Sequence, residues 1–211
     1  MEKEKREVPS LLRKILAVDA YVTDEFVKKL ETISLLRQLR VHCKLLEISA
    51  HGIPWLAGSL ALIWILNSKS LYQLQINLFI GLLVDIFFIA ILKAVTRRRR
   101  PVKTDDPFAM GPDKYSFPSG HASRSTFITY FFINLSPLPL IFIPPLFAWT
   151  ISVCLSRLLM RRHHILDITA GVALGLLNGL LIGMMYLDAD TCLGLVSWLT
   201  DEKLDGGEYH V

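Results

Sequence analysis

Three short segments of the sequence contain the side chains that metal-free phosphoryl transfer needs. They hold Lys93 and Arg100, then Ser119, Gly120 and His121, and finally Arg157, His163 and Asp167. A neutral imidazole can attack phosphorus, and a second imidazole, when protonated, can give a proton to the leaving oxygen. Lysine and arginine can carry the negative charge of the phosphoryl group. The pattern therefore predicts a site that binds and transfers phosphate.

The middle segment has the composition of an anion-binding helix start. Ser119, Gly120 and His121 precede an apolar run, so we expect them at the N-terminus of a helix. Backbone N–H groups there have no acceptor within the helix, and the helix dipole favours a negative charge. Gly120 also lets the backbone approach a ligand closely. Together with the three cations, these groups form a predicted phosphate cradle.

Two adjacent histidines, His163 and His164, differ in their relation to the nearest carboxylate. Asp167 follows His163 by four residues, which places it one helical turn away. A carboxylate in that position can fix the imidazole tautomer and stabilise a positive charge on the ring. His163 is therefore preferred over His164 as a catalytic residue. The residues alone leave open whether His163 or His121 is the nucleophile.

The acidic residues near these segments do not form a metal-binding pattern. Asp105, Asp106 and Asp113 lie in a loop without a recognisable metal spacing. We expect no metal ion and no cofactor. Arginine and lysine would then carry the transition-state charge that magnesium carries in other phosphoryl-transfer sites.

The elements that position these segments are predicted to be membrane helices. Apolar residues make up 52% of the 211 residues, and the mean hydropathy is +0.43. The predicted spans cover about residues 53–66, 74–95, 122–135, 138–155 and 165–187. Pro144 and Pro145 are expected to bend the fourth span. The expected fold is an all-α, multi-pass membrane helix bundle of about five spans.

An amphipathic helix is predicted before the first span. Apolar residues recur with helical periodicity from Thr23 to about Ile48, and basic residues lie between them. This segment carries too many charges to span a membrane. Such a helix can lie in the membrane interface or cap the bundle. We therefore divide the chain into a charged tail with an amphipathic segment (1–48), a membrane domain (49–190) and an acidic tail (191–211). Residues 1–8 are expected to be disordered.

The order of the spans brings the chemical residues together. If five spans alternate in direction, the loops after the second and fourth spans lie on one membrane face. All three segments then meet at one end of the bundle. The positive-inside rule favours the cytosolic face for these basic loops, although the same cations also serve phosphate binding. Nucleic acid is not an expected partner, because the basic clusters border membrane spans.

Other residues in the spans are assigned structural roles. Gly171, Gly175, Gly179 and Gly183 recur every four residues, which predicts a smooth stripe for close helix packing. Asp85 lies within the second span, where an acid is either functional or paired.

We favour a structural ion pair for Asp85, with Arg124 as its candidate partner. Arg97, Arg98 and Arg99 are interpreted as a charged stop after the second span, with no catalytic part.

The three segments resemble a known signature. Lys93-x6-Arg100-Pro101, Pro118-Ser119-Gly120-His121 and Ser156-Arg157-x5-His163-x3-Asp167 are similar, in order, to the motifs of the type 2 phosphatidic acid phosphatase family. The resemblance covers about residues 50–187. The flanking residues 96–101 and 113–124 look closer to one branch, the polyisoprenoid diphosphate phosphatases. Family members often have six spans, one more than the sequence predicts here.

The resemblance implies a role for each residue. His163 would form a phosphohistidine, Asp167 would orient it, and His121 would protonate the leaving lipid oxygen. The phosphoryl oxygens would be held by Lys93, Arg100, Ser119, Gly120 and Arg157. The family is described as magnesium-independent, in agreement with the loop composition.

The resulting hypothesis is a membrane phosphatase acting on a lipid phosphate or diphosphate. Polyisoprenoid diphosphates such as presqualene or farnesyl diphosphate are the favoured substrates, with phosphatidic acid as another candidate. The alternatives are a catalytically inactive scaffold of the same family, a haloperoxidase and a channel or transporter. By resemblance, the endoplasmic reticulum or nuclear envelope is the expected membrane. No oligomeric state is predicted.

Overall fold

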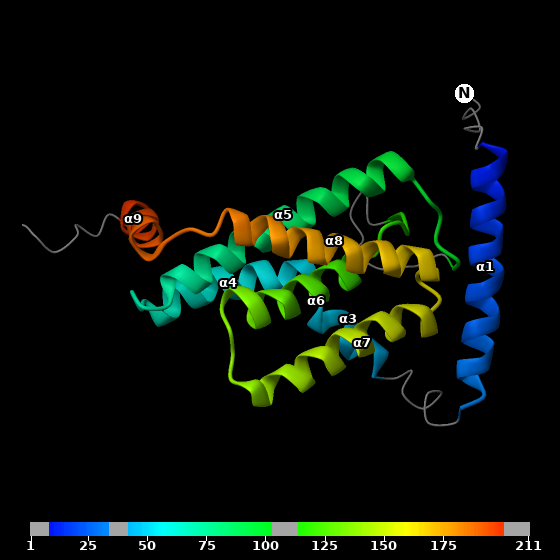
Figure 1. The fold of residues 1–211 in the computed structure, drawn as a ribbon, viewed down its shortest axis with the longest axis horizontal. Coiled ribbons are helices and arrows are strands. Elements are labelled where there is room, and N and C mark those ends of the chain that lie inside the picture. The colour runs from blue at the N-terminus through cyan, green and yellow to red at the C-terminus, as the bar shows by residue number, and fades with distance from the viewer. Residues whose placement is uncertain (1–8, 34–41, 103–113, 201–211) are drawn as a thin grey trace, which may run out of the picture.

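Five helices run along the long axis of the molecule and form its core (Figure 1). They are α4 (Gly52–Leu66), α5 (Tyr72–Thr96), α6 (Gly120–Tyr130), α7 (Ile143–Leu159) and α8 (Ile165–Met184). Consecutive helices in this set run in opposite directions. The computed structural model describes residues 9–33, 42–102 and 114–200. The expected disordered residues 1–8 and the loop acids Asp105, Asp106 and Asp113 lie outside this range.

Fewer helices than expected have the length and composition of a membrane span. Within the described residues, α5, α8 and the segment Leu140–Leu159 are long and apolar enough to cross a bilayer. A fourth span results if α3 (Cys43–Ser49) and α4, which meet at a bend of 48°, are taken as one. Among the described residues, three helices, or four spans with the bent pair, therefore meet this length and composition criterion, where the sequence predicts about five. The predicted all-α, multi-pass membrane helix bundle is confirmed.

Helix α6 accounts for the difference. It lies in the middle of the bundle, and every residue from Ala122 to Thr129 is buried. The helix continues as a π-helical turn, η3 (Phe131–Leu135). A helix that is surrounded by protein has no need of the apolar surface that lipid demands. The serines, threonines and arginine of α6 are compatible with its place in the bundle for this reason.

The glycine stripe of α8 forms the contact with α6, as predicted. A Cβ atom on Gly171 would lie 2.5 Å from the backbone oxygen of Ser119, and one on Gly175 would meet the backbone oxygen of Ser123. Gly179 and Gly183 face Tyr130 and Leu135 farther along. Helix α8 therefore approaches α6 and η3 closely, because a glycine without a side chain occurs at every fourth residue along this face.

An apolar core surrounds the part of this contact that lies away from Ser119. Its buried members come from α5, α6, η3 and α8: Leu78, Leu82, Phe127, Ile128, Phe131 and Ile182. Gly81 of α5 admits the ring of Phe127, since any Cβ there would overlap that ring. The core thus fixes α5, α6 and α8 relative to one another, and these three helices carry most of the predicted site.

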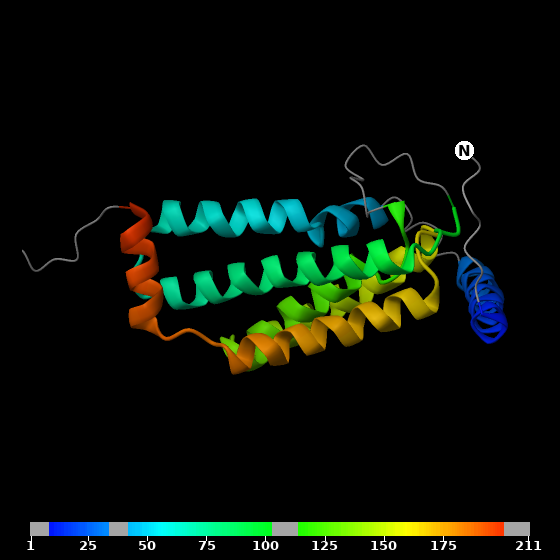
Figure 2. The ribbon, with the colours of Figure 1, turned by 90° about the horizontal axis from the view of Figure 1, so that it is seen from above.

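Helix α1 (Ser10–Glu31) lies crosswise at the end of the bundle where α6 and α8 begin (Figures 1 and 2). Its inner side buries Thr23 and Val27 against α7 and α8. Its outer side exposes Leu11, Ile15 and Val18. The predicted amphipathic helix is present, but it begins earlier than expected. Part of the range 23–48 forms α3 instead, and residues 34–41 are outside the described part.

Two local expectations are corrected at the other end of the bundle. Residues 189–200 form helix α9, which lies crosswise there, although most of them were assigned to an acidic tail. Pro144 and Pro145 do not bend a span; they lie in the first turn of α7, after the short 3₁₀ turn η4 (Leu140–Phe142). Proline is compatible with a first turn because its missing N–H has no helical partner there.

Candidate active site

The three chemical segments meet at one end of the bundle, as the order of the spans predicts. The C-terminal end of α5, the N-terminal end of α6 and the turn between α7 and α8 lie together there (Figure 1). Two backbone hydrogen bonds join them directly. Ser119 N donates to Asp167 O over 2.9 Å, and Ser116 N donates to Arg98 O over 2.8 Å.

The start of α6 has the geometry of an anion-binding helix terminus. Ser119 is the N-cap, and its hydroxyl accepts a hydrogen bond from Ala122 N over 3.4 Å. Gly120 and His121 follow in the first turn, where backbone N–H groups have no intrahelical acceptor. All the side chains here except His121 are fully enclosed. The predicted cradle is therefore formed by the backbone of a buried helix start.

His163 and Asp167 face each other across one turn. The Nδ1 atom of His163 lies 3.7 Å from Oδ2 of Asp167, and both side chains are buried. Within the described residues Nδ1 has no hydrogen-bond partner at this distance. Catalytic hydrogen bonds are often long in the absence of substrate and shorten when it binds. A carboxylate facing Nδ1 leaves Nε2 as the atom available for attack.

The surroundings of His163 keep its imidazole neutral. Burial lowers the pKa of His163 to about 4, against an upward effect of Asp167. The positive charges of Arg100 and Lys93 lower the pKa further. A neutral ring with a lone pair is the form that can attack phosphorus. Lys93 and Arg100 are thus close enough to His163 to disfavour a proton on its ring.

His121 approaches the same place from α6. Its Nε2 atom is buried and has no hydrogen-bond partner within the part of the chain that the structure describes. Burial, and after it the positive charge of Arg157, lower the pKa of His121 well below its usual value. The ring packs edge-to-face against His51, with ring centroids 5.8 Å apart. The two predicted catalytic histidines therefore belong to one site.

Arg157 is in the cluster but holds a partner that the sequence did not suggest. Its Nη1 atom lies 3.0 Å from Oε1 of Glu47 on α3, and its Nη2 atom contacts the carbonyl oxygen of Cys43. Arg162, in the following turn, has a buried Nη1 atom without a hydrogen-bond partner among the described residues. Arg162 is therefore a further candidate cation at this site, which sequence reasoning missed.

Sequence reasoning also missed two neighbours of Asp167. The guanidinium group of Arg98 donates to Oδ1 of Asp167 over 2.7 Å. The backbone N–H of His164 donates to Oδ2 over 2.8 Å. The Nδ1 atom of His164 lies 3.3 Å from the same oxygen, closer than the 3.7 Å of His163 Nδ1, so Asp167 contacts both histidine rings. The interpretation of Arg98 as part of a charged stop is therefore wrong, because its side chain is directed into the site. No local signal separates Arg98 from Arg97 and Arg99, since all three are arginines in one run.

The acid within α5 has the structural role that the sequence favoured. Asp85 Oδ2 lies 3.0 Å from Arg124 Nη2, and Ser123 donates its hydroxyl to Oδ1. Arg124 also donates to the carbonyl oxygen of Ala50 at the bend between α3 and α4. This pair ties α4, α5 and α6 together below the site. Among the described residues, no group of three or more metal-ligating side chains occurs.

A comparison with protein families decides the relationship. Residues 75–189 match the model of the PAP2 superfamily, which is more than half of the chain. The chain belongs to the PAP2 superfamily. All three chemical segments of this PAP2 protein lie within the matched residues. Its apolar helices make it an integral membrane protein.

Relatives and a solved structure agree with this assignment. The PAP2 protein is 31% identical over 163 residues to "Probable lipid phosphate phosphatase beta" of Arabidopsis thaliana, covering 64% of this chain and 75% of the relative. It is 34% identical over 98 residues to decaprenylphosphoryl-5-phosphoribose phosphatase of Mycobacterium tuberculosis, covering 44% of this chain and half of that relative. The crystal structure of LpxE from Aquifex aeolicus shares the fold, with a TM-score of 0.53 and 19% identity, over 69% of this chain and 85% of LpxE.

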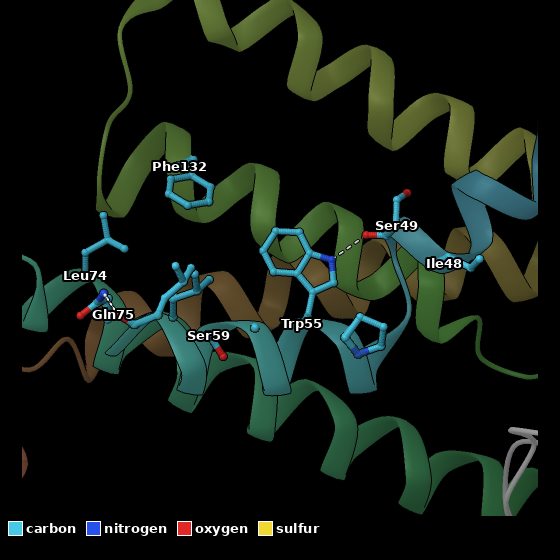
Figure 3. A pocket seen from close by; sticks show the side chains of 11 residues that line it. Ile48, Ser49, Trp55, Ser59, Leu74, Gln75 and Phe132 are labelled. Carbon is cyan, nitrogen blue, oxygen red and sulfur yellow. Dashed lines mark hydrogen bonds between the residues drawn. The ribbon is translucent and has the colours of Figure 1, made fainter. Parts of the chain in front are cut away.

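An apolar groove extends from the bend between α3 and α4 into the bundle (Figure 3). Its volume is about 460 Å³, and α3, α4, α5 and η3 line it. Figure 3 shows Ser49 at one end, Leu74 at the other and Trp55 between them. Trp55 donates its indole N–H to the carbonyl oxygen of Ser49, and Trp149 of α7 donates to the Ser49 hydroxyl. Ser49, at one end of the groove, precedes His51 by two residues, and the ring of His51 contacts His121.

Proposed function

We propose that this PAP2 protein is a metal-independent lipid phosphatase that uses His163 as its nucleophile. The observation that carries the proposal is the meeting of all three segments, with Asp167 hydrogen-bonded to the backbone of the α6 start and facing His163. The names of two relatives, a lipid phosphate phosphatase and a prenyl-lipid phosphatase, support a lipid phosphate as substrate.

The reaction follows from the roles of the two histidines. Nε2 of His163 attacks the terminal phosphorus, and the bond between this phosphorus and the oxygen of the leaving group breaks as His121 gives that oxygen a proton. The leaving group is the lipid monophosphate when the substrate is a diphosphate, and the lipid alcohol when it is a monophosphate. Asp167 stabilises the positive charge on the phosphorylated ring. His121 then takes a proton from water, which attacks the phosphohistidine and releases phosphate as the P–N bond breaks. The two steps together restore a neutral, unmodified His163 and a protonated His121 for the next substrate.

The phosphoryl group has several donors available in this site. The negative charge that develops on its oxygens would be stabilised by side-chain cations and by the backbone of the α6 start. These groups are Lys93, Arg100, Ser119, Gly120 and Arg157. Donors fixed in a buried site stabilise a developing charge without reorganisation, which is where most of the rate enhancement would come from.

The preferred substrate is a polyisoprenoid diphosphate. The membrane in which the protein resides is that of the endoplasmic reticulum. The flanking sequences 96–101 and 113–124 support this branch of the family by resemblance. The groove beside α4 supports a lipid tail, because its lining is apolar and it begins near the catalytic histidines. The tail would lie in the groove while the diphosphate reaches His163.

The activity is tested by phosphate release from farnesyl diphosphate in detergent with a chelator present. The wild-type protein is expected to release phosphate, and His163→Ala is expected to release none above background. His42→Ala, which changes a histidine at the start of α3, serves as the matched control and should keep full activity. Equal release by the wild type and His163→Ala would sink the proposal, as would loss of wild-type activity on chelation.

The tail groove has a separate test at Gly58. This residue lines the groove, and a Cβ placed on it has nothing within 4 Å. Gly58→Leu should fill the groove without strain and raise KM for farnesyl diphosphate at least tenfold, while the short dimethylallyl diphosphate is unaffected. Gly194→Leu on α9 is the control, since its surroundings are equally open. Equal effects of Gly58→Leu on both substrates would contradict binding of the lipid tail in the groove.

A further inference from the structure

Helix α1 reaches the catalytic helix α8 with two side chains. Oδ1 of Asp19 accepts a hydrogen bond from Leu166 N over 3.0 Å, and Oγ1 of Thr23 accepts one from Ile165 N over 3.0 Å. These N–H groups belong to the first turn of α8 and have no acceptor within the helix. A negative charge beside this helix start is favourable as well. Helix α1 thus caps α8 from outside.

The second oxygen of Asp19 is the start of a chain of charges. Its Oδ2 lies 2.6 Å from Nη2 of Arg98, and Nη1 of Arg98 lies 2.7 Å from Oδ1 of Asp167. The side chain of Asp19 is 10% exposed, that of Arg98 is 11% exposed and that of Asp167 is 0% exposed. Ion pairs this enclosed are weakly screened by solvent, so the attraction between the partners is stronger than at the surface. Arg98 therefore bridges a carboxylate of α1 and the carboxylate that faces His163.

This chain determines how the carboxylate of Asp167 is turned. With Oδ1 held by Arg98 and Oδ2 held by the N–H of His164, the side chain presents Oδ2 to Nδ1 of His163. Removing Arg98 would leave a buried oxygen without its donor, and the carboxylate would rotate to satisfy it. Small displacements of a group that orients a catalytic histidine reduce the rate strongly.

We propose that Arg98 and Asp19 are positioning residues that hold Asp167 toward His163. Neither residue touches the substrate. Asp19 lies outside residues 75–189, so α1 contributes to catalysis from beyond the matched PAP2 region. The proposal rests on the proposed role of His163, and it adds a requirement that the three motif segments do not contain.

The proposal is tested with Arg98→Gln and Asp19→Asn in the full-length protein. Both variants should lower kcat for farnesyl diphosphate about 10- to 100-fold, as loss of groups that orient catalytic histidines does elsewhere. KM and the inhibition constant of inorganic phosphate should stay within twofold, because the cradle is unchanged. Arg98→Lys should recover part of the loss. The double variant should be no slower than Arg98→Gln, since both changes interrupt one chain.

Three controls separate positioning from other roles. Arg99→Gln removes the neighbouring, exposed arginine, and Glu25→Gln removes an α1 carboxylate that pairs with Lys28 on the same helix; both should keep wild-type kcat. Thr23→Val loosens α1 without touching Arg98 and should lower the melting temperature while kcat stays near wild type.

Two outcomes would overturn the proposal. A rise of KM and weaker phosphate inhibition in Arg98→Gln would make Arg98 a direct phosphate ligand. Unchanged kcat in Asp19→Asn would remove α1 from the chain. The wild type and His163→Ala are measured in the same assay, so an inactive wild type would signal failure of the proposed function instead.

Discussion

The contact between Gly171 and the phosphate cradle allows a sharp test of how packing supports catalysis. A methyl group on Gly171 would lie 2.5 Å from the backbone oxygen of Ser119 and 3.1 Å from Cβ of Ala122. The first neighbour is backbone at the helix start that we assign to phosphate binding, so it cannot rotate away as a flexible side chain can. Gly171→Ala should therefore damage both stability and activity.

The size of the effect follows from the geometry. Ordinary contact begins at 3.4 Å, so the two helices must separate locally by 3.4 − 2.5 = 0.9 Å. Overpacking of this kind costs about 1–3 kcal/mol of folding free energy, and replacing a helical glycine by alanine returns up to about 1 kcal/mol. Because a displacement of about 1 Å in a catalytic site can cost about 100-fold in rate, kcat/KM should fall by that order.

The assay compares Gly171→Ala with two alanine variants in the same detergent. Gly183→Ala lies on the same stripe but meets only the flexible end of Leu135 at 3.0 Å, and Gly194→Ala meets nothing within 4 Å. We expect a lower melting temperature and a large loss of kcat/KM for Gly171→Ala, and near-wild-type values for the other two. A Gly171→Ala protein that matched Gly194→Ala in both measurements would refute the reasoning.

Three further predictions concern charge and the membrane. Since neutral His163 is the attacking form and its pKa is lowered to about 4, the acid limb of kcat/KM should lie near pH 4; an acid limb near pH 6.5 would contradict this. Asp85→Asn leaves the buried Arg124 without its carboxylate and should destabilise the protein by about 3–5 kcal/mol. The double variant Asp85→Leu with Arg124→Leu should recover much of this loss, and equal melting temperatures for Asp85→Asn and the wild type would argue against a structural pair. Val18→Cys carrying an environment-sensitive dye should fluoresce as in an apolar medium after reconstitution, because the outer side of α1 is exposed and apolar; a water-like spectrum would place α1 off the membrane.

The elements and their order could be predicted because their signals are local. Long apolar runs marked α5 and α8, and the four-residue spacing of glycines marked the face of α8 that meets α6. Helix α6 was placed correctly, but it is shorter and more enclosed by protein than the predicted span. Whether a polar helix contacts lipid or protein depends on its neighbours, and a single sequence does not contain that information.

The supporting residues of the site could not be predicted for the same reason. Arg98 contacts Asp167, which is 69 positions away in the sequence, and Asp19, which is 79 positions away. Arg157 likewise pairs with Glu47 from another helix. Motif spacing identifies groups that share a turn or a helix start. Partners brought together by the packing of α1 and α3 against the bundle carry no such spacing.

The central claim is that His163 carries the phosphoryl group during the reaction, and it can be measured directly. The wild-type protein is mixed briefly with farnesyl diphosphate, quenched in alkali, in which phosphohistidine is stable, and digested for mass spectrometry. We predict a phosphoryl group on the peptide that contains His163, and none on that peptide in His163→Ala. A phosphoryl group on another residue, or hydrolysis that proceeds while His163 is never modified, would contradict the account.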